Sequence, residues 1–231
     1  MSKGSIALSY SRLSTYEQCP RQFRAQYITK TYPQDDDNPH FIRGKRIHKQ
    51  MEDYTLAKAL DGNLPELSHE AQNGKGIVDS VIANFDQVYA EQQIAIDDDW
   101  SKIDWFDKQA YYRAIFDLVA LKGKQGLIID WKTGKVRDYD DTSTGQLHLS
   151  ATILLSIQPQ LDFVDTAYSF LEHKHTIKRR FERSQLPELM KPFQEAYITV
   201  NSDNEFLPKK NKYCYFCLID SDECEFKKPS L

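Results

Sequence analysis

Two aspartates and a lysine are spaced so that they could hold a metal ion beside a cationic side chain. Asp117 interrupts the apolar run "RAIFDLVAL", and Asp130 and Lys132 end a second run, "GLIIDWK". Side chains alternate in direction along a strand, so Asp130 and Lys132 share one face while Trp131 points away. The short turn "KGKQG" separates the two runs and predicts antiparallel neighbours, which places Asp117 near Asp130 at one edge of a sheet.

This pattern favours hydrolysis of a phosphodiester bond. Two carboxylates that end apolar strands are costly to bury unless a cation compensates them, and Mg²⁺ or Mn²⁺ suits oxygen ligands. Lys132 beside that ion would orient or deprotonate a water, or stabilise charge on a phosphate oxygen. A surface salt bridge between Asp130 and Lys132 is the simpler alternative, and the spacing by itself leaves it open.

The cysteines form a second group with the spacing of a metal site. Cys19 stands alone near the start of the chain, and Cys214, Cys217 and Cys224 follow within "YCYFCLIDSDEC". In a reducing compartment such spacing favours a metal site over disulfide bonds. Four thiolates suit either an iron–sulfur cluster or a tetrahedral zinc ion, and the residues alone do not separate the two.

The composition is that of an ordinary globular chain. The 231 residues are 40% hydrophobic and 28% charged, and the formal net charge of −4 excludes the global basic field that many nucleic-acid binders carry. The sequence shows neither an apolar signal region nor an apolar run of transmembrane length. We therefore expect a soluble, cytoplasmic protein with no membrane partner.

The elements that must position these residues alternate between helical and strand patterns, which predicts one mixed α/β domain over 1–231. A loop is expected over 31–40 and a polar loop over 133–142. The predicted helices lie at 9–28 (interrupted at Pro20), about 41–60 (carrying His48), 77–87, from Ser143 or Thr144 to Pro159, and from about Pro187. The predicted strands lie at 88–96, 110–121, 127–131, 165–171 and 176–183.

The stretch "FDLVALKGKQGLIIDWKTGK" resembles the PD-(D/E)XK nuclease superfamily, in particular its RecB-like branch, which includes the Cas4-like exonucleases. That branch has an Asp in the second core strand and an Asp/Glu-X-Lys in the third. The resemblance spans 9–224, and its other motifs occur in the expected order. They are "LSYSRLSTYEQCPRQF" in the N-terminal segment, His48 at a metal-binding His, Glu91 at an acidic position of the first core strand, and Gln146 at the Gln of a Gln-X-X-X-Tyr helix motif.

The resemblance implies a restriction-endonuclease-like core, in which helices flank a central mixed β-sheet. It divides the chain into a helical part (about 9–87), a nuclease core (about 88–200) and a C-terminal cysteine cluster (213–226), with the N- and C-terminal segments stapled by a metal cluster. The residues with an implied catalytic role are Lys132, Asp117, Asp130 and Gln146. The implied ligands of Mg²⁺ or Mn²⁺ are His48, Asp117, Asp130 and the Trp131 carbonyl, with Glu91 as an additional acid.

The resemblance also bears on the cysteines. Several RecB-like nucleases bind a 4Fe-4S cluster through one distant N-terminal Cys and a C-terminal trio of nearly this spacing. It therefore favours 4Fe-4S over Zn²⁺ at Cys19, Cys214, Cys217 and Cys224. The second gap in the trio is six residues here instead of the usual five, a difference that a loop would absorb.

One motif departs from the family pattern. The Tyr of the helix motif would fall at Ser150, so that substrate contact is missing or comes from elsewhere, with Tyr168 as the expected replacement. Arg21 and Arg24 are expected to contact DNA phosphates, although each basic patch could equally be a solvated surface. Exposed aromatic side chains nearby would stack on the unpaired bases of a single-stranded end.

The leading hypothesis is a metal-dependent deoxyribonuclease, an exonuclease that acts on single-stranded DNA ends. The sequence has no P-loop pattern, so a helicase motor would come from a partner in recombination, repair or CRISPR adaptation, or would be unnecessary. A phage's own DNA metabolism in a bacterial host is a further setting. The alternatives are a nuclease-fold subunit that binds nucleic acid without efficient catalysis, and a zinc-stapled structural module with an incidental Asp-X-Lys.

Overall fold

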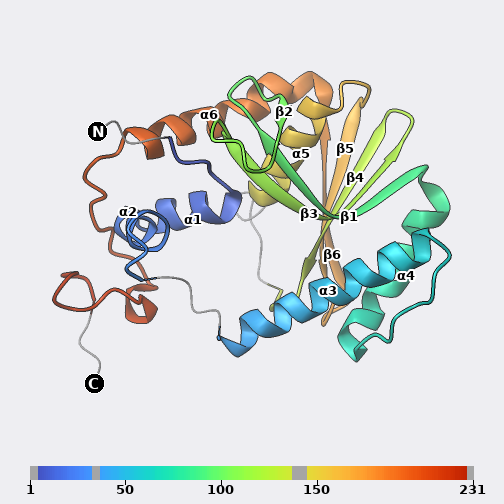
Figure 1. Cartoon of the computed structure of the whole chain (residues 1–231), viewed down its shortest axis with the longest axis horizontal. Helices are drawn as coiled ribbons and strands as arrows, with labels where there is room; N and C mark the ends of the chain where they lie inside the picture. The colour runs from blue at the N-terminus through green and yellow to red at the C-terminus, as the bar shows by residue number, and fades with distance from the viewer. Residues whose placement is uncertain (1–4, 33–36, 137–144, 228–231) are drawn as a thin grey trace.

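The computed structural model describes residues 5–32, 37–136 and 145–227, in which helices cover both faces of a six-stranded sheet (Figure 1). The strand order is β2-β1-β3-β4-β5-β6, and neighbours are antiparallel except for the parallel pair β4 and β5. This mixed sheet confirms the predicted α/β class. The strands are β1 (Gln87–Ile96), β2 (Lys102–Ile103), β3 (Tyr112–Lys122), β4 (Gln125–Lys132), β5 (Phe163–Phe170) and β6 (His175–Glu182).

The two faces of the sheet are buried against different helices. One face packs on α5 (Gly145–Ile157) and α6 (Leu186–Ser202), and the short 3-10 helix η3 (Arg183–Gln185) joins β6 to α6. The other face packs on α3 (Pro39–Ala59) and α4 (His69–Asn84). The strands β3 and β4 contribute to both cores, as alternating side chains require. Polar side chains at the ends of these strands therefore lie between the two helical layers.

The N-terminal helix predicted over 9–28 is divided, as the proline suggested. Ser9 caps α1 (Tyr10–Gln18), Cys19 is extended, and Pro20 begins α2 (Pro20–Phe23), which runs into the π-helix η1 (Arg24–Ile28). A proline at the first helical position has no amide that needs a partner, so a new helix starts there readily. The cysteine is thus fixed between two helices.

The helix predicted over 77–87 is wrong at its start. Helix α4 begins at His69, because the Ser68 side chain accepts a hydrogen bond from the amide of Ala71. Gly74 lies where α4 packs on α3, and a Cβ there would meet Met51 Cε at 2.6 Å. The two-residue strand β2 was not predicted. The start predicted for the next helix, Ser143 or Thr144, lies outside the described residues.

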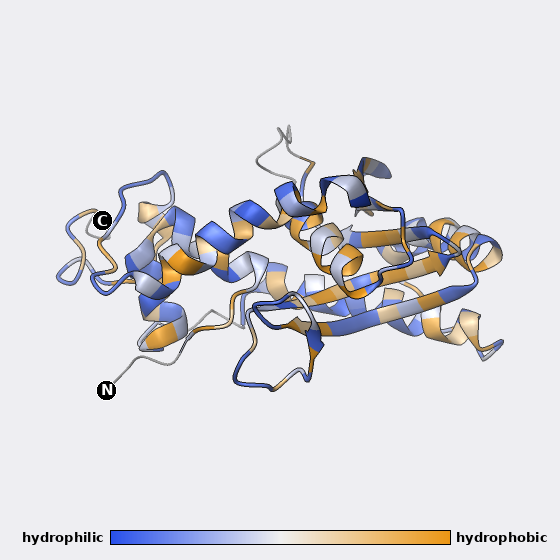
Figure 2. Cartoon of the chain, turned by 90° about the horizontal axis from the view of Figure 1, so that it is seen from above, coloured by the Kyte–Doolittle hydropathy of each residue, from blue (hydrophilic) through white to orange (hydrophobic). Residues whose placement is uncertain are grey.

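Both ends of the chain lie at the same end of the molecule, away from the sheet (Figure 2). Hydrogen bonds join them directly: Arg21 donates to the Glu223 carbonyl at 2.6 Å, and the Tyr32 hydroxyl donates to Asp220 at 2.9 Å. The C-terminal segment contains only the short 3-10 helix η4 (Cys214–Phe216) among its described residues. None of the described helices is long and apolar enough to cross a lipid bilayer.

Candidate active site

Strands β3 and β4 separate at Asp117, and the candidate site lies at this fork. Strand β3 pairs with β1 along almost its whole length, but with β4 only from Leu118 onward. At the point of separation the Asp117 carboxylate accepts a hydrogen bond from the backbone amide of Trp131 at 2.7 Å. The antiparallel pairing therefore brings Asp117 beside Asp130, as the sequence predicts.

The alternation of side chains reverses at this point in β3. Phe116 and Leu118 are two residues apart, yet they lie in the cores on opposite faces of the sheet. Glu91, the residue opposite Asp117 in β1, has a φ of 46°, in the left-handed region that non-glycine residues rarely adopt. Such a conformation costs about 1–3 kcal/mol and persists only where the surrounding structure fixes it. Here it accompanies two carboxylates facing one histidine.

His48 of α3 completes a group that could hold a metal ion. One ligand atom each from His48, Glu91 and Asp117 lies within 4.8 Å of the other two. His48 Nδ1 is 3.2 Å from Asp117 Oδ1 and 3.9 Å from Glu91 Oε1. The ligands of an octahedral Mg²⁺ at about 2.1 Å lie roughly 3.0–4.2 Å apart, so both distances suit one ion. Glu91, expected only as an additional acid, is thus a full member of this group.

Asp130 lies beside this group and is held by two side chains. Gln146 of α5 donates to Asp130 Oδ1 at 2.5 Å and accepts a hydrogen bond from Lys132 Nζ at 2.9 Å. Lys132 Nζ also lies 2.7 Å from Asp130 Oδ2 in an ion pair. Asp130 Oδ2 is buried, and the cation that lies against it is the Lys132 ammonium. The buried carboxylates gathered beside His48 fit a divalent metal.

The pKa values of three side chains at the site are raised. Burial raises the pKa of Glu91 to about 7, and the negative charge of Asp117 adds to this effect. Burial likewise raises the pKa of Asp130 above its usual range, against the opposing charge of Lys132. Burial lowers the pKa of His48, but the hydrogen bond to Asp117 and the surrounding carboxylates outweigh it and raise this pKa to about 9. A divalent cation would displace these protons.

Tyr168 lies in the core beside Lys132. Its side chain is only 2% exposed, and Lys132 Nζ lies 4.6 Å from the centroid of its ring. Strand β5 turns the ring toward Leu147, and its contact with substrate remains a prediction. Ser150, which stands where the motif has Tyr, is buried and lines a cavity next to Gln146.

Arg21 and Arg24 lie in another part of the molecule from the carboxylates. Both line a cavity that also contains Glu223 and Phe206, and Arg21 is engaged with the C-terminal segment as described above. The guanidinium of Arg24 lies 6.0 Å from the ring centroid of Phe206. None of the metal-binding candidates lines this cavity. Their contact with DNA phosphates remains a prediction.

The four cysteines line one small cavity between the two ends of the chain. Backbone amides of Lys209 and Asn211 donate to the sulfurs of Cys19 and Cys214 at 3.4 and 3.3 Å. Burial raises the pKa of the Cys217 thiol, and charges on Cys19 and Cys224 contribute. Within the described residues, no three of these sulfurs lie within 4.8 Å of one another. The four cysteines thus share a cavity without forming a close group of sulfurs, and a metal cluster there remains a prediction.

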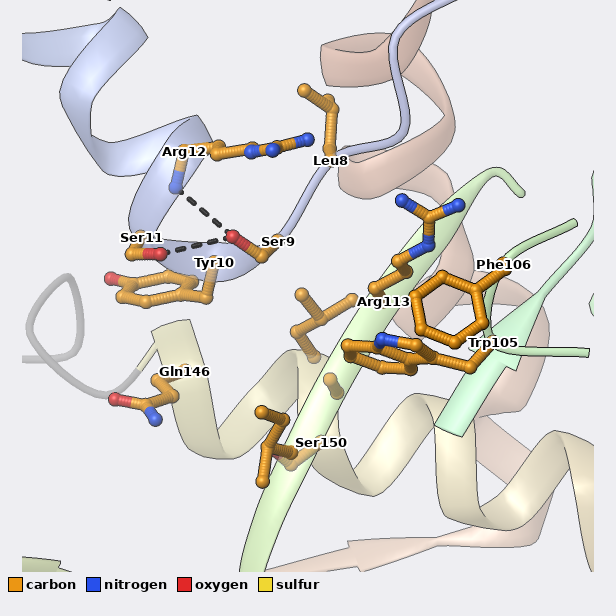
Figure 3. A pocket seen from close by; sticks show the side chains of 13 residues that line it. Leu8, Ser9, Tyr10, Ser11, Arg12, Trp105, Phe106, Arg113, Gln146 and Ser150 are labelled. Carbon is orange, nitrogen blue, oxygen red and sulfur yellow. Dashed lines mark hydrogen bonds between the residues drawn. The ribbon is translucent and has the colours of Figure 1, made fainter. Parts of the chain in front are cut away.

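A second cavity, of about 550 Å³, opens beside Gln146 (Figure 3). Its walls include Trp105, Phe106 and Arg113, none of which was singled out from the sequence. The two aromatic residues could have been noticed in the sequence, because Trp105 and Phe106 are adjacent in the acidic stretch "DWFD" and exposed rings there suggest a binding surface. This cavity belongs to the surroundings of the candidate active site.

The comparisons with known proteins agree with this geometry. The family model of the PD-(D/E)XK nuclease superfamily matches residues 7–227. The chain therefore belongs to this superfamily, and its mixed sheet between helices is the restriction-endonuclease-like fold predicted above. Members of the superfamily are nucleases that use divalent metals such as Mg²⁺ or Mn²⁺, so the class of protein is a metal-dependent nuclease with a nucleic-acid substrate.

One solved structure extends the likeness of the fold. The crystal structure of SSO0001 is similar with a TM-score of 0.50 and 14% sequence identity, and the match covers 99% of this chain and 89% of that one. At this identity the likeness concerns the fold alone. No curated protein sequence matches the chain significantly.

Proposed function

We propose that the chain is a metal-dependent deoxyribonuclease that acts as an exonuclease on single-stranded DNA ends. The observation that carries this proposal is the arrangement at the fork between β3 and β4. His48, Glu91 and Asp117 face one another, and the buried Asp130 stands beside them in an ion pair with Lys132. Lys132 lies next to this group and is directed there by Gln146.

Each side chain has a separate task in this proposal. His48, Glu91, Asp117 and Asp130 hold the divalent ion, with the Trp131 carbonyl as a further ligand. The bound ion supplies a more acidic water and stabilises negative charge on the phosphoryl oxygens. Lys132 contacts the scissile phosphate or orients the attacking water. Gln146 is a positioning residue, because it fixes both Asp130 and Lys132.

We also assign the chain to the RecB-like and Cas4-like branch with a 4Fe-4S cluster at Cys19, Cys214, Cys217 and Cys224. The shared cavity and the amide donors to two of the sulfurs support this assignment. A closed zinc site with bonds of about 2.3 Å would place its sulfurs roughly 3.8 Å apart. Among the described residues no three of the four sulfurs lie within 4.8 Å of one another, so they are not preformed for a closed zinc site. The cluster staples the ends of the chain and takes no part in hydrolysis.

A nuclease-fold subunit that binds nucleic acid without efficient catalysis is the second candidate. It is favoured by one observation: Ser150 stands where the helix motif has Tyr, and Tyr168, the expected replacement, is buried. In either case a helicase or a recombination or CRISPR adaptation partner would deliver the single strand. Catalysis by the purified chain decides between the two candidates.

The test is cleavage of single-stranded DNA labelled at either end, with Mn²⁺ or Mg²⁺, by anaerobically purified protein and by Lys132→Ala. We expect cleavage by the parent, inhibition by EDTA and no product with the variant. A ladder that shortens from one labelled end identifies an exonuclease and its polarity. A parent as inactive as Lys132→Ala, yet bound to the DNA, would leave the binding subunit in place of the nuclease.

A further inference from the structure

The cavity beside Gln146 combines aromatic and cationic side chains that the catalytic site does not use. Figure 3 shows the rings of Trp105 and Phe106 on one side of it, with Tyr10 and Gln146 on the other. At about 550 Å³ it falls within the range of small-molecule and cofactor sites. Because Gln146 holds Asp130 and Lys132, whatever occupies this cavity lies next to the reacting phosphate.

The aromatic wall is exposed and held in place. Phe106 is 83% exposed, although burying such a ring would normally be favourable. Its turn is fixed by side-chain hydrogen bonds: Asp104 accepts from the amide of Phe106 at 2.9 Å, and Asp107 accepts from the amide of Gln109 at 2.8 Å. A ring presented on an ordered turn loses little freedom when a ligand stacks on it.

The two arginines of the cationic wall contact backbone carbonyls and an aromatic ring. Arg12 donates to the Ala7 carbonyl at 2.7 Å, and Arg113 donates to the Asp107 carbonyl at 2.9 Å and lies 5.8 Å from the ring centroid of Trp105. Arg12 and Arg113 both line the cavity, and among the described residues neither forms an ion pair with a carboxylate. The Nε of Arg113 is buried and has no hydrogen-bond partner in the described part of the chain. Burial lowers the pKa of Arg12, and the positive charge of Arg113 contributes. Two partly buried arginines in this state would be stabilised by an anion such as a phosphate.

The cavity continues toward the metal site. Ile115 lines the cavity beside Gln146 and also lines a different cavity, whose walls include His48 and Glu91. The side chain of Ile115 is 46% exposed, as expected for a residue between two open spaces. A strand lying across Ile115 would therefore place one nucleotide near Phe106 and a neighbouring phosphodiester near the metal ligands.

We propose that this cavity binds an unpaired nucleobase of the substrate strand on Trp105 and Phe106, and the adjoining phosphate on Arg12 and Arg113. This inference rests on the proposed nuclease function. In a duplex both faces of an interior base are covered by its neighbours, so only an unstacked base can lie flat on these rings. The site therefore selects single-stranded or frayed ends over intact duplex.

Binding to a dT₂₀ oligonucleotide and to a blunt duplex, measured by fluorescence anisotropy in EDTA, tests the proposal without cleavage. Base–aromatic stacking has a measured range that corresponds to about 5-fold to 150-fold in affinity, so Phe106→Ala should weaken binding of dT₂₀ by that factor. Its effect on duplex binding should be much smaller. Leu60→Ala removes an equally exposed apolar side chain, 79% exposed at the end of α3, and should leave both affinities unchanged.

Two further measurements address the rings and the arginines separately. Trp100 and Trp131 are buried, so quenching of tryptophan emission by dT₂₀ should come from Trp105 and disappear in Trp105→Phe. Arg113→Gln should reduce the slope of log affinity against log salt by about 0.7. Unchanged dT₂₀ affinity in Phe106→Ala, or quenching that persists in Trp105→Phe, would overturn the proposal.

Failure of this inference can be told apart from failure of the nuclease function. If the parent cleaves DNA with Mn²⁺ while Phe106→Ala binds and cleaves like the parent, the base-binding site is refuted and the nuclease stands. If the parent does not cleave but loses single-strand binding in Phe106→Ala, the site stands and the catalytic function is refuted.

Discussion

Replacing Gln146 by Ala tests the positioning of the catalytic groups while every proposed metal ligand is retained. The Gln146 amide donates to Asp130 and accepts from Lys132, so one substitution removes a hydrogen bond from each. Lys132 would retain its ion pair with Asp130, at 2.7 Å, and would follow that carboxylate instead of pointing to a phosphate.

The expected loss follows from the bonds removed. A hydrogen bond to a charged group contributes about 1.5–3 kcal/mol, which corresponds to roughly 10-fold to 150-fold in rate if it is needed in the transition state. The freed Asp130 should also lower the affinity for the metal, since removal of a residue that orients a ligand typically costs about 10-fold to 100-fold. Gln146→Ala should therefore be slow even at saturating metal.

The assay is single-turnover cleavage of single-stranded DNA over a titration of Mn²⁺, with the melting temperature as a check on folding. Gln158→Ala is the matched control, because this residue lies just beyond the end of α5 and its side chain contacts only Gln160 among the described residues. Its rate should equal that of the parent. A Gln146→Ala protein that is folded and cleaves at the parent rate at every metal concentration would refute the positioning role.

Three other properties follow from the same structure. The pKa of His48 is raised to about 9 and that of Glu91 to about 7, so Mn²⁺ binding should release protons. The affinity for Mn²⁺ should therefore increase from about pH 6.5 to 8.5. Calorimetric heats at pH 7 that do not vary with the ionisation enthalpy of the buffer would contradict this. Because folding raises the pKa of Glu91, the metal-free protein loses stability as pH rises from about 4.5 to 7. Glu91→Gln should accordingly raise the melting temperature in EDTA at pH 8 and have little effect at pH 4.5, whereas an equal shift at both pH values would argue against the assigned cause. If a cluster joins Cys19 to Cys224, it closes a loop of about 200 residues, which contributes roughly 5 kcal/mol to stability by the loop-entropy relation. Cys224→Ser should therefore lower the melting temperature by about 10–20 °C and abolish the iron absorbance. A parent protein without iron, and a variant that melts at the parent's temperature, would disprove the staple.

The central part of the fold could be predicted from the sequence because its elements follow simple periodicities. Strands β3 and β4 are alternating or continuous apolar runs joined by a short turn, which determines their antiparallel pairing and the proximity of Asp117 and Asp130. The helix around His48 has a regular apolar stripe that includes Ile47 and Met51. The proximity of the two carboxylates could be predicted because they interrupt these patterns.

Other parts of the site depend on tertiary contacts that no periodicity reports. The reversal of side chains at Asp117 and the left-handed backbone of Glu91 belong to the pairing of β1 with β3, so the closeness of Glu91 to His48 could not be predicted from periodicity. The burial of Tyr168 depends on the parallel pairing of β5 with β4. Phe106 lies in a polar loop whose hydrogen bonds, and not its hydropathy, determine where the ring points.

The central claim is that His48, Glu91, Asp117 and Asp130 together hold one divalent cation beside Lys132. Anomalous diffraction from crystals of the full chain soaked in Mn²⁺ tests it directly. We expect an anomalous peak for Mn²⁺ at about 2.1 Å from an oxygen of each carboxylate and close to His48 Nδ1, with the Lys132 ammonium next to it. A crystal that binds Mn²⁺ elsewhere, with the ion pair of Lys132 and Asp130 unchanged and no peak at the fork, would contradict it.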